Sequence, residues 1–165
     1  MCIQGGIWMN KMEMFQEMTK RIQADDSLAV SVWRGTFEFV GGEPTASKIE
    51  NLNPIEGMPE MPKGKMTAVE MLVVSAANCY ATTFHKNAYF NKISFSKVKI
   101  QFTGKFDQKP FLGLNDGNPG MIEPEIVLSV ESSADATKIE KIANLSITES
   151  PVLMSLNQDV SLTIQ

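Results

Sequence analysis

One stretch of the chain, from Thr67 to about Tyr89, constrains the fold more than any other. It includes the segment MTAVEMLVVSAANCYATTFHK, which follows a helical pattern with apolar side chains on nearly every side. A helix that is apolar nearly all round is typically buried in the core of a protein. Glu70, Asn78 and Thr82 make it too polar to span a membrane, which takes about 20 mostly apolar residues. We therefore expect a central buried helix and no membrane association.

The first turn of this helix carries a capping signal. Thr67 is followed three residues later by Glu70, which is the spacing of a capping box. In such a box the threonine side chain accepts a backbone N–H, and the glutamate reaches back to the N–H of the threonine.

A helix this apolar needs cover on all sides. A 165-residue chain with small sheets provides too little, so we expect a homodimer.

The other segments predict an α+β fold, because extended segments and helices come in separate blocks along the chain. Alternating apolar residues predict strands, and apolar residues at helical spacing predict helices. We expect an N-terminal amphipathic helix within a first unit, residues 1–26, followed by a domain of residues 27–165. The expected helices are 8–23, 134–147 and 150–156, the expected strands are 28–40, 45–52, 93–106, 125–131 and 160–164, and the long loops are 53–65 and 107–124.

Composition excludes several classes of function. The formal net charge is −4, and no cluster of lysine and arginine stands out, so we expect no nucleic-acid partner. A single histidine and the lack of a C-x-x-C pair argue against a zinc site, and no glycine-rich phosphate loop follows a strand, so we expect no metal or nucleotide cofactor. The two cysteines, Cys2 and Cys79, make no disulfide framework, and no signal peptide precedes them, which favours a cytoplasmic protein with reduced thiols.

Cys79 lies in the middle of the apolar helix, and two interpretations of it stay open. Free cysteine is among the most buried residue types, so Cys79 fits a small core position. As a thiolate it would instead be a nucleophile, which a nearby base or cation activates. His85 is about 240° around the helix and Glu70 about 180°, so neither reaches the sulfur from the same helix. An activator must therefore come from another segment or subunit, and we interpret His85 as a helix-surface or interface residue.

Two motifs carry a family resemblance. The pattern T-A-V-E-M-L-(x)6-C-Y-A-T begins at Thr67, and S-P-V-L-M-S-L begins at Ser150. Together they resemble the OsmC/Ohr family of thiol-dependent hydroperoxide reductases, over residues 28–165 in order and spacing. The resemblance implies an OsmC-like sandwich, in which two small antiparallel sheets pack around a long central helix in an intertwined homodimer.

The resemblance also implies roles for particular residues. In the family a first cysteine attacks the peroxide O–O bond, and a second cysteine resolves the sulfenic acid as a disulfide. Cys79 stands at the first position, but Ser150 stands at the second, where it forms no disulfide and is also explained as the cap of the short helix. The family's arginine corresponds to Arg34, which fits an exposed strand-edge charge equally well. Its glutamate corresponds to Glu70, one residue out of register, where the capping role is favoured.

Three hypotheses follow. The first is a one-cysteine thiol peroxidase, in which Cys79 reduces an organic hydroperoxide and an external thiol reduces the enzyme again. The second is a non-catalytic homologue that binds a small hydrophobic ligand at the dimer interface. The third is a structural or interaction module with an inert Cys79. The first two are nearly equal on the sequence, and the third ranks below them.

Overall fold

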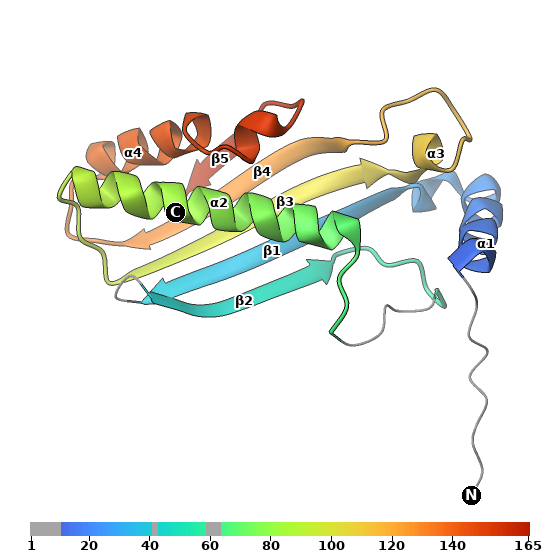
Figure 1. Ribbon diagram of the computed structural model, residues 1–165, viewed down its shortest axis with the longest axis horizontal. Coiled ribbons are helices and arrows are strands. Elements are labelled where there is room, and N and C mark those ends of the chain that lie inside the picture. Colours follow the sequence, from blue (N-terminus) through green and yellow to red (C-terminus); the bar gives the residue numbers. More distant parts are fainter. Residues whose placement is uncertain (1–10, 41–42, 59–63) are drawn as a thin grey trace, which may run out of the picture.

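The computed structural model describes residues 11–40, 43–58 and 64–165. These residues form a mixed α+β fold, as the sequence predicted, with a long helix lying across a sheet (Figure 1). In chain order its elements are α1 (Lys11–Ala24), η1 (Asp26–Leu28), β1 (Val30–Val40), β2 (Glu43–Asn51), α2 (Ala68–Phe90), β3 (Lys97–Asp107), α3 (Gln108–Phe111), β4 (Met121–Glu131), α4 (Ala136–Thr148), η2 (Leu153–Ser155) and β5 (Ser161–Ile164).

The strands form one sheet in the order β2-β1-β3-β4-β5. We expected two small antiparallel sheets, and the described residues correct this. The 11 residues of β1 pair with β2 along one edge and with β3 along the other, so the sheet is continuous. The last strand, β5, is parallel to β4, because α4 carries the chain back between them, as a parallel pair requires.

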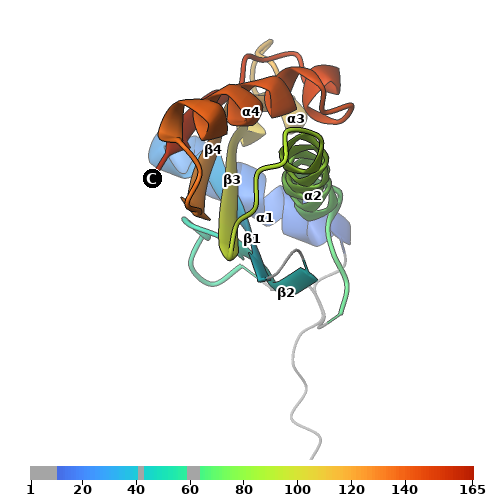
Figure 2. The same ribbon diagram turned by 90° about the vertical axis from the view of Figure 1, so that its left-hand side faces the viewer.

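The two faces of the sheet differ sharply in polarity. One face carries apolar side chains from every second residue of the central strands, and α2 and α4 cover it (Figure 2). Gly35 lets α2 approach closely, because a Cβ at this position would lie 3.2 Å from the Val73 side chain. The long helix therefore packs where the sequence predicted a central one. Fully buried residues on this face include Val98, Ile100, Phe102, Ile126 and Leu128.

The capping box at the start of α2 is confirmed. The Glu70 N–H donates to the Thr67 hydroxyl at 3.1 Å, and the Thr67 N–H donates to the Glu70 carboxylate at 2.6 Å. Further along, the buried Tyr80 hydroxyl donates to the carbonyl of Ala143 on α4 at 3.2 Å, and burial raises the pKa of Tyr80. None of the helices in the described ranges is long and apolar enough to cross a membrane.

Several element boundaries differ from the sequence prediction. The strand expected to begin at Glu125 begins at Met121, because its pairing with β3 continues past a register shift. Glu123 has φ 48° at this irregularity, a bulge that accommodates the proline after it. The predicted loop therefore contains the start of β4 and the short α3. The helix predicted from residue 8 is described from Lys11, and its first residues, with Cys2, lie outside the described ranges.

The helix α1 lies at one end of the sheet, beside α3 (Figure 1). The rings of Phe15 and Phe111 meet edge to face there, with centroids 5.5 Å apart. Its Ile22 is buried, whereas Met12 is 60 % exposed. The amphipathic pattern thus produces a helix packed by one side only. The division of the chain between residues 26 and 27 stays a prediction.

Candidate functional site

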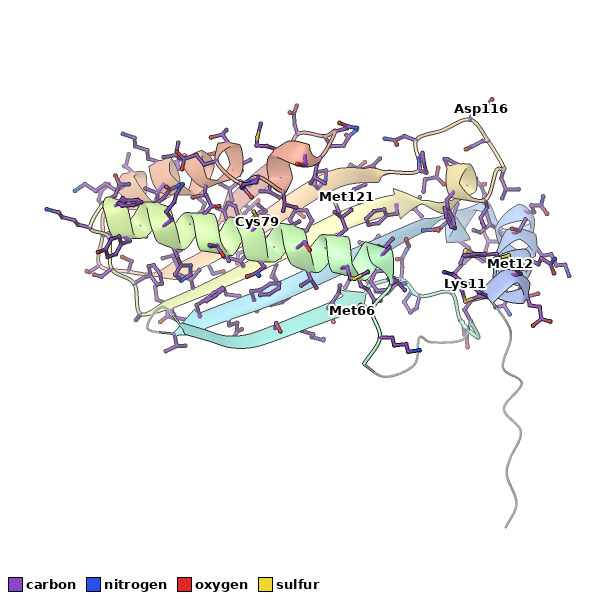
Figure 3. The ribbon with its side chains drawn as sticks, in the orientation of Figure 1. Lys11, Met12, Met66, Cys79, Asp116 and Met121 are labelled. Carbon is purple, nitrogen blue, oxygen red and sulfur yellow. The ribbon has the colours of Figure 1, made fainter. Side chains whose placement is uncertain are left out.

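Cys79 lies near the middle of α2 (Figure 3) and is a free, partly exposed cysteine. The backbone of Cys79 is part of the helix, and the Thr83 hydroxyl also donates a hydrogen bond to the Cys79 carbonyl at 2.8 Å. Two neighbours on the same side of the helix, Ser75 and Thr83, are small. A thiol in this position is anchored by a rigid element and still reachable from one side. Cys79 is neither fully buried nor fully exposed, so its interpretations as a small core residue and as a nucleophile both stay predictions.

The sulfur has a hydrogen-bond donor from a distant part of the chain. The Ser150 hydroxyl donates to the Cys79 sulfur at 3.1 Å, and Ser150 is completely buried. Ser150 follows α4 directly, where Pro151 prevents the helix from continuing. Its N–H donates to the Ile147 carbonyl at 3.2 Å, and its carbonyl accepts the Met154 N–H at 2.9 Å. The turn therefore fixes this residue over α2.

This geometry corrects one prediction about Ser150. We expected its side chain to cap a short helix over residues 150–156. Instead the turn is the shorter η2, whose N-cap is Val152 and has no side-chain hydrogen bond. The backbone carbonyl of Ser150 accepts a hydrogen bond within the turn, and the hydroxyl of Ser150 donates to the sulfur. The two motifs, 71 residues apart, thus meet at one contact.

Two further contacts between α2 and α4 lie beside this one. The Lys86 ammonium is 2.6 Å from the Glu149 carboxylate, and the buried Asn87 amide donates to the Ser146 hydroxyl at 3.0 Å. The hydrogen bond from Lys86 lowers the pKa of Glu149, and Asn87 contributes in the same direction. Sequence reasoning missed this pair, although Lys86 is seven residues after Cys79 and Glu149 directly precedes Ser150.

Arg34 does not approach Cys79 within one subunit. Successive residues of a strand point to opposite faces, and Gly35 contacts α2, so Arg34 lies on the other face of the sheet. Its Nε donates to Thr103 on β3 at 3.3 Å, and its charge contributes to lowering the pKa of Glu50, after the larger effect of Lys48. The alternation of residues 34–39 was the signal that could have placed it. Its catalytic role stays a prediction without support from the single chain.

The other two candidate residues have structural partners. Glu70 makes the capping box, at the opposite helical angle from Cys79, so its second role also stays a prediction. His85 is partly buried. Its Nδ1 is 2.8 Å from the Ala81 carbonyl, and its ring lies 4.6 Å from that of Phe39 and 4.9 Å from that of Phe95. The Nε2 atom of His85 is buried and has no hydrogen-bond partner among the described residues.

Neither a metal-ligand cluster nor either of two surface hollows lies at Cys79 among the described residues. Within residues 11–40, 43–58 and 64–165, no three His, Cys, Asp or Glu side chains gather as metal ligands. Two surface hollows measure about 620 and 550 Å³. One lies between α1 and α3, and the other lies around η2, so neither has Cys79 in its wall. A single thiol beside a hydroxyl donor is compatible with chemistry that needs only one sulfur atom of the protein.

Comparison with known proteins identifies relatives. The sequence profile of a family described as OsmC-like protein matches residues 61–165. The fold is similar to a solved OsmC-like protein from Mycoplasma pneumoniae, with 19% identity, a TM-score of 0.53 and coverage of 64% of this chain and 77% of the other. It is also similar to an OsmC-like hydroperoxide resistance protein from Jannaschia sp. ccs1, with 12% identity, a TM-score of 0.54 and coverage of 79% and 89%. No curated protein matches the chain.

Proposed function

The chain belongs to the OsmC-like family, and from this premise we propose that it is a one-cysteine thiol peroxidase that reduces organic hydroperoxides with an external thiol. The observation that carries the proposal is the 3.1 Å contact between the Ser150 hydroxyl and the Cys79 sulfur. Ser150 occupies the position of the family's second cysteine. The contact supports a site in which positions 79 and 150 still meet although the resolving thiol is absent. The Jannaschia protein is named a hydroperoxide resistance protein, which is consistent with this chemistry.

The reaction uses one sulfur in three steps. The Cys79 thiolate attacks the outer peroxide oxygen, the O–O bond breaks, and the alkoxide takes a proton to leave as an alcohol. The sulfur is now a sulfenic acid. A small thiol then displaces water and forms a mixed disulfide, and a second thiol releases Cys79 as a thiol and leaves as the oxidised disulfide. Each turnover thus consumes two external thiols and one hydroperoxide, and it yields one alcohol and one water.

Ser150 takes the role that an arginine would otherwise have at the sulfur. A thiolate accepts a hydrogen bond more strongly than a thiol, and bonds to charged groups contribute more than neutral ones. Arg34 lies on the other face of the sheet in the single chain and does not supply a cation to Cys79 there. The proposed mechanism therefore relies on the hydroxyl at this step.

A second subunit completes the site in this proposal. Cys79 borders a row of exposed residues on α2, spaced along one side of the helix. A partner helix over this row would enclose the sulfur and exclude water from the organic part of a hydroperoxide. The proposed enzyme is therefore a homodimer, and a reducing cytoplasm would supply its thiols. The exposed row consists of Met71, Ser75, Asn78 and Thr82.

Trapping of the sulfenic acid tests this function. We would treat the protein with one equivalent of cumene hydroperoxide in the presence of dimedone and map the product by mass spectrometry. The expected result is one dimedone adduct on Cys79, together with steady consumption of peroxide when a small thiol is added. The Cys2→Ser variant is the matched control and should behave like the wild type, whereas Cys79→Ser should not react. An unmodified Cys79 with unconsumed peroxide would refute the peroxidase.

One observation favours a second function. No lysine or arginine of the described residues hydrogen-bonds to the sulfur, and Arg34 lies on the far face of the sheet. A homologue without peroxidase activity that binds a small hydrophobic ligand between its subunits fits this arrangement. A thermal-shift series with fatty acids distinguishes the two functions. A rise in melting temperature that Cys79→Ser retains, in a protein that does not consume peroxide, would favour binding.

A further inference from the structure

Lys86 and Glu149 form an ion pair at the edge of the Cys79 site, and the chemistry proposed above does not use it. Lys86 is seven residues after Cys79, which is about 20° short of two full turns and about 10 Å along the helix. The two side chains therefore leave α2 on the same side. Glu149 is the residue directly before Ser150. The ion pair and the contact at the sulfur thus join the same two segments of the chain.

The segment that carries Ser150 is held by backbone hydrogen bonds within its turn and by the buried Leu153, and it has few side-chain caps. Glu149 is the C-cap of α4, and η2 lacks a side-chain cap. Near the C-terminal end of α2, the hydrogen bond from Asn87 to Ser146 fixes the last full turn of α4. Beyond that turn, the carboxylate of Glu149, the residue before Ser150, accepts a hydrogen bond from the Lys86 ammonium on α2. This pairing at 2.6 Å restrains where the turn sits over the sulfur.

We propose that Lys86, acting through Glu149, is a positioning residue that holds the Ser150 side chain at the Cys79 sulfur. Lys86 does not touch the reacting atoms in this role. The inference deepens the proposed function and depends on it only for the claim that Cys79 is the reacting atom. The positioning itself concerns a distance between two side chains, so it can be measured without peroxide.

The expected effect is modest, because both side chains are partly exposed, at 44% and 39%. Exposed ion pairs are weak since water screens them, and their loss corresponds to a change of about two- to five-fold in an equilibrium constant. An effect of this size is too small to unfold the protein. It is large enough to measure in an equilibrium that reports directly on the separation of positions 79 and 150.

A cysteine at position 150 provides that equilibrium. In the Ser150→Cys variant, oxidised glutathione takes two electrons and two protons from the pair, and one bond forms between the sulfurs of positions 79 and 150. The ratio of disulfide to dithiol in glutathione buffers measures how often the two side chains meet. We expect Lys86→Met and Glu149→Gln, each added to Ser150→Cys, to lower this equilibrium constant about two- to five-fold. The variants would carry Cys2→Ser so that position 2 cannot exchange.

The reversed pair separates positioning from general loss of structure. Lys86→Glu with Glu149→Lys restores an ion pair at the same place, so it should recover most of the equilibrium constant. Lys141→Met removes an exposed α4 cation that has no ion pair among the described residues, and it should change nothing. Circular dichroism would confirm that each variant is folded.

Three results would overturn the inference. The single variants could leave the constant unchanged, the reversed pair could be as weak as the single variants, or Ser150→Cys could form no disulfide at all. The last result would mean that the contact to be positioned does not exist. All three are independent of peroxide, so failure of the peroxidase test alone would remove the proposed function and leave the positioning result to stand.

Discussion

At the scale of single residues, position 150 decides which redox chemistry the proposed enzyme could use. Serine and cysteine differ by one atom, and here the oxygen lies 3.1 Å from the Cys79 sulfur. A sulfur at this position could form a disulfide, which needs an S–S distance of about 2.0 Å. A serine hydroxyl cannot form that bond, and here it donates a hydrogen bond to the sulfur. In the proposed enzyme, a serine here would therefore stabilise the thiolate, whereas a cysteine would resolve the sulfenic acid.

Removal of the hydroxyl should slow the first chemical step. We expect Ser150→Ala to form the Cys79 sulfenic acid about tenfold more slowly, because a hydrogen bond to a charged group contributes roughly 1.5 kcal/mol. Stability should change by less than about 1 kcal/mol, since the lost partner is a weakly accepting sulfur. Rapid-quench trapping with dimedone gives the rate. Ser155→Ala is the control, because its hydroxyl bonds to a backbone carbonyl, and equal rates for both variants would contradict the role of Ser150.

The ion pair beside the site makes a prediction about pH. The hydrogen bond from Lys86 lowers the pKa of Glu149 from its ordinary value of 4.5. A lowered pKa in the folded protein means that the carboxylate stabilises the fold above pH 4.5, and that this contribution disappears as the pH falls through the folded value. Denaturant unfolding should therefore show Glu149→Gln to be less stable than the wild type at pH 7, with a difference that shrinks as the pH falls below 4.5 through the lowered folded value. A constant difference would contradict this linkage.

At the scale of elements, the start of α2 shows how a local signal produces a defined structure. Thr67 and Glu70 satisfy two backbone N–H groups that the first turn would otherwise leave without partners. Unsatisfied groups of this kind limit helix stability. The capping box thereby fixes where the helix begins, and with it which side of the helix carries Cys79.

Variants of the capping box separate its two predicted roles. Thr67→Ala and Glu70→Ala should each lower the free energy of unfolding by about 1 kcal/mol, and the double variant should lose less than the sum because the two bonds act together. Glu70→Gln should stay close to the wild type, since glutamine also serves in a capping box. Urea unfolding measures these values. A Glu70→Gln protein of normal stability but without peroxide reactivity would instead support the catalytic role.

The alternating residue pattern of β1 could be interpreted fully only once the helix packed against the strand was known. Its alternation places Gly35, Phe37 and Phe39 on one face and Arg34 on the other. Alternation of this kind separates the two faces but does not say which neighbours each face meets. The close approach of α2 to Gly35 identifies the covered face. The same contact shows why a cation from this strand does not reach Cys79 in one subunit.

At the scale of the whole molecule, the sheet has one apolar face under two helices and one polar face. On the polar face, Glu38 lies within 4.0 Å of Lys97 and Lys99, so water is a sufficient cover. The outer side of α2 is different, because none of the described residues covers it, and Met71 is 51% exposed and Tyr89 79%. Exposed apolar side chains along a central helix favour association with a second copy.

We therefore predict that light scattering after size exclusion gives a mass of twice the 18.2 kDa chain. Asn78→Arg places a large charge in the middle of the exposed row, so it should shift the protein to the monomer. Gln101→Arg, on the polar face of the sheet, is the matched control and should remain dimeric. A monomeric wild type, or a dimer that Gln101→Arg disrupts and Asn78→Arg does not, would contradict an interface through α2.

The sequence by itself determined the local features of this protein. Helical spacing of apolar residues predicted α2 and α4, alternation predicted the central strands, and the capping box predicted where α2 begins. These features depend on residues a few positions apart, which the backbone geometry of a helix or strand brings together. The positions of the two family motifs, at Cys79 and Ser150, also belong to the sequence.

Only the tertiary structure decided how distant segments meet. It joined the strands into one sheet with β5 beside β4, placed Arg34 on the face away from α2, and directed the Ser150 hydroxyl to sulfur instead of to a helix cap. Each of these outcomes joins residues far apart in the chain. Periodicity carries no information about such pairs, because the chain brings them together only when the whole apolar face of the sheet is packed against its helices.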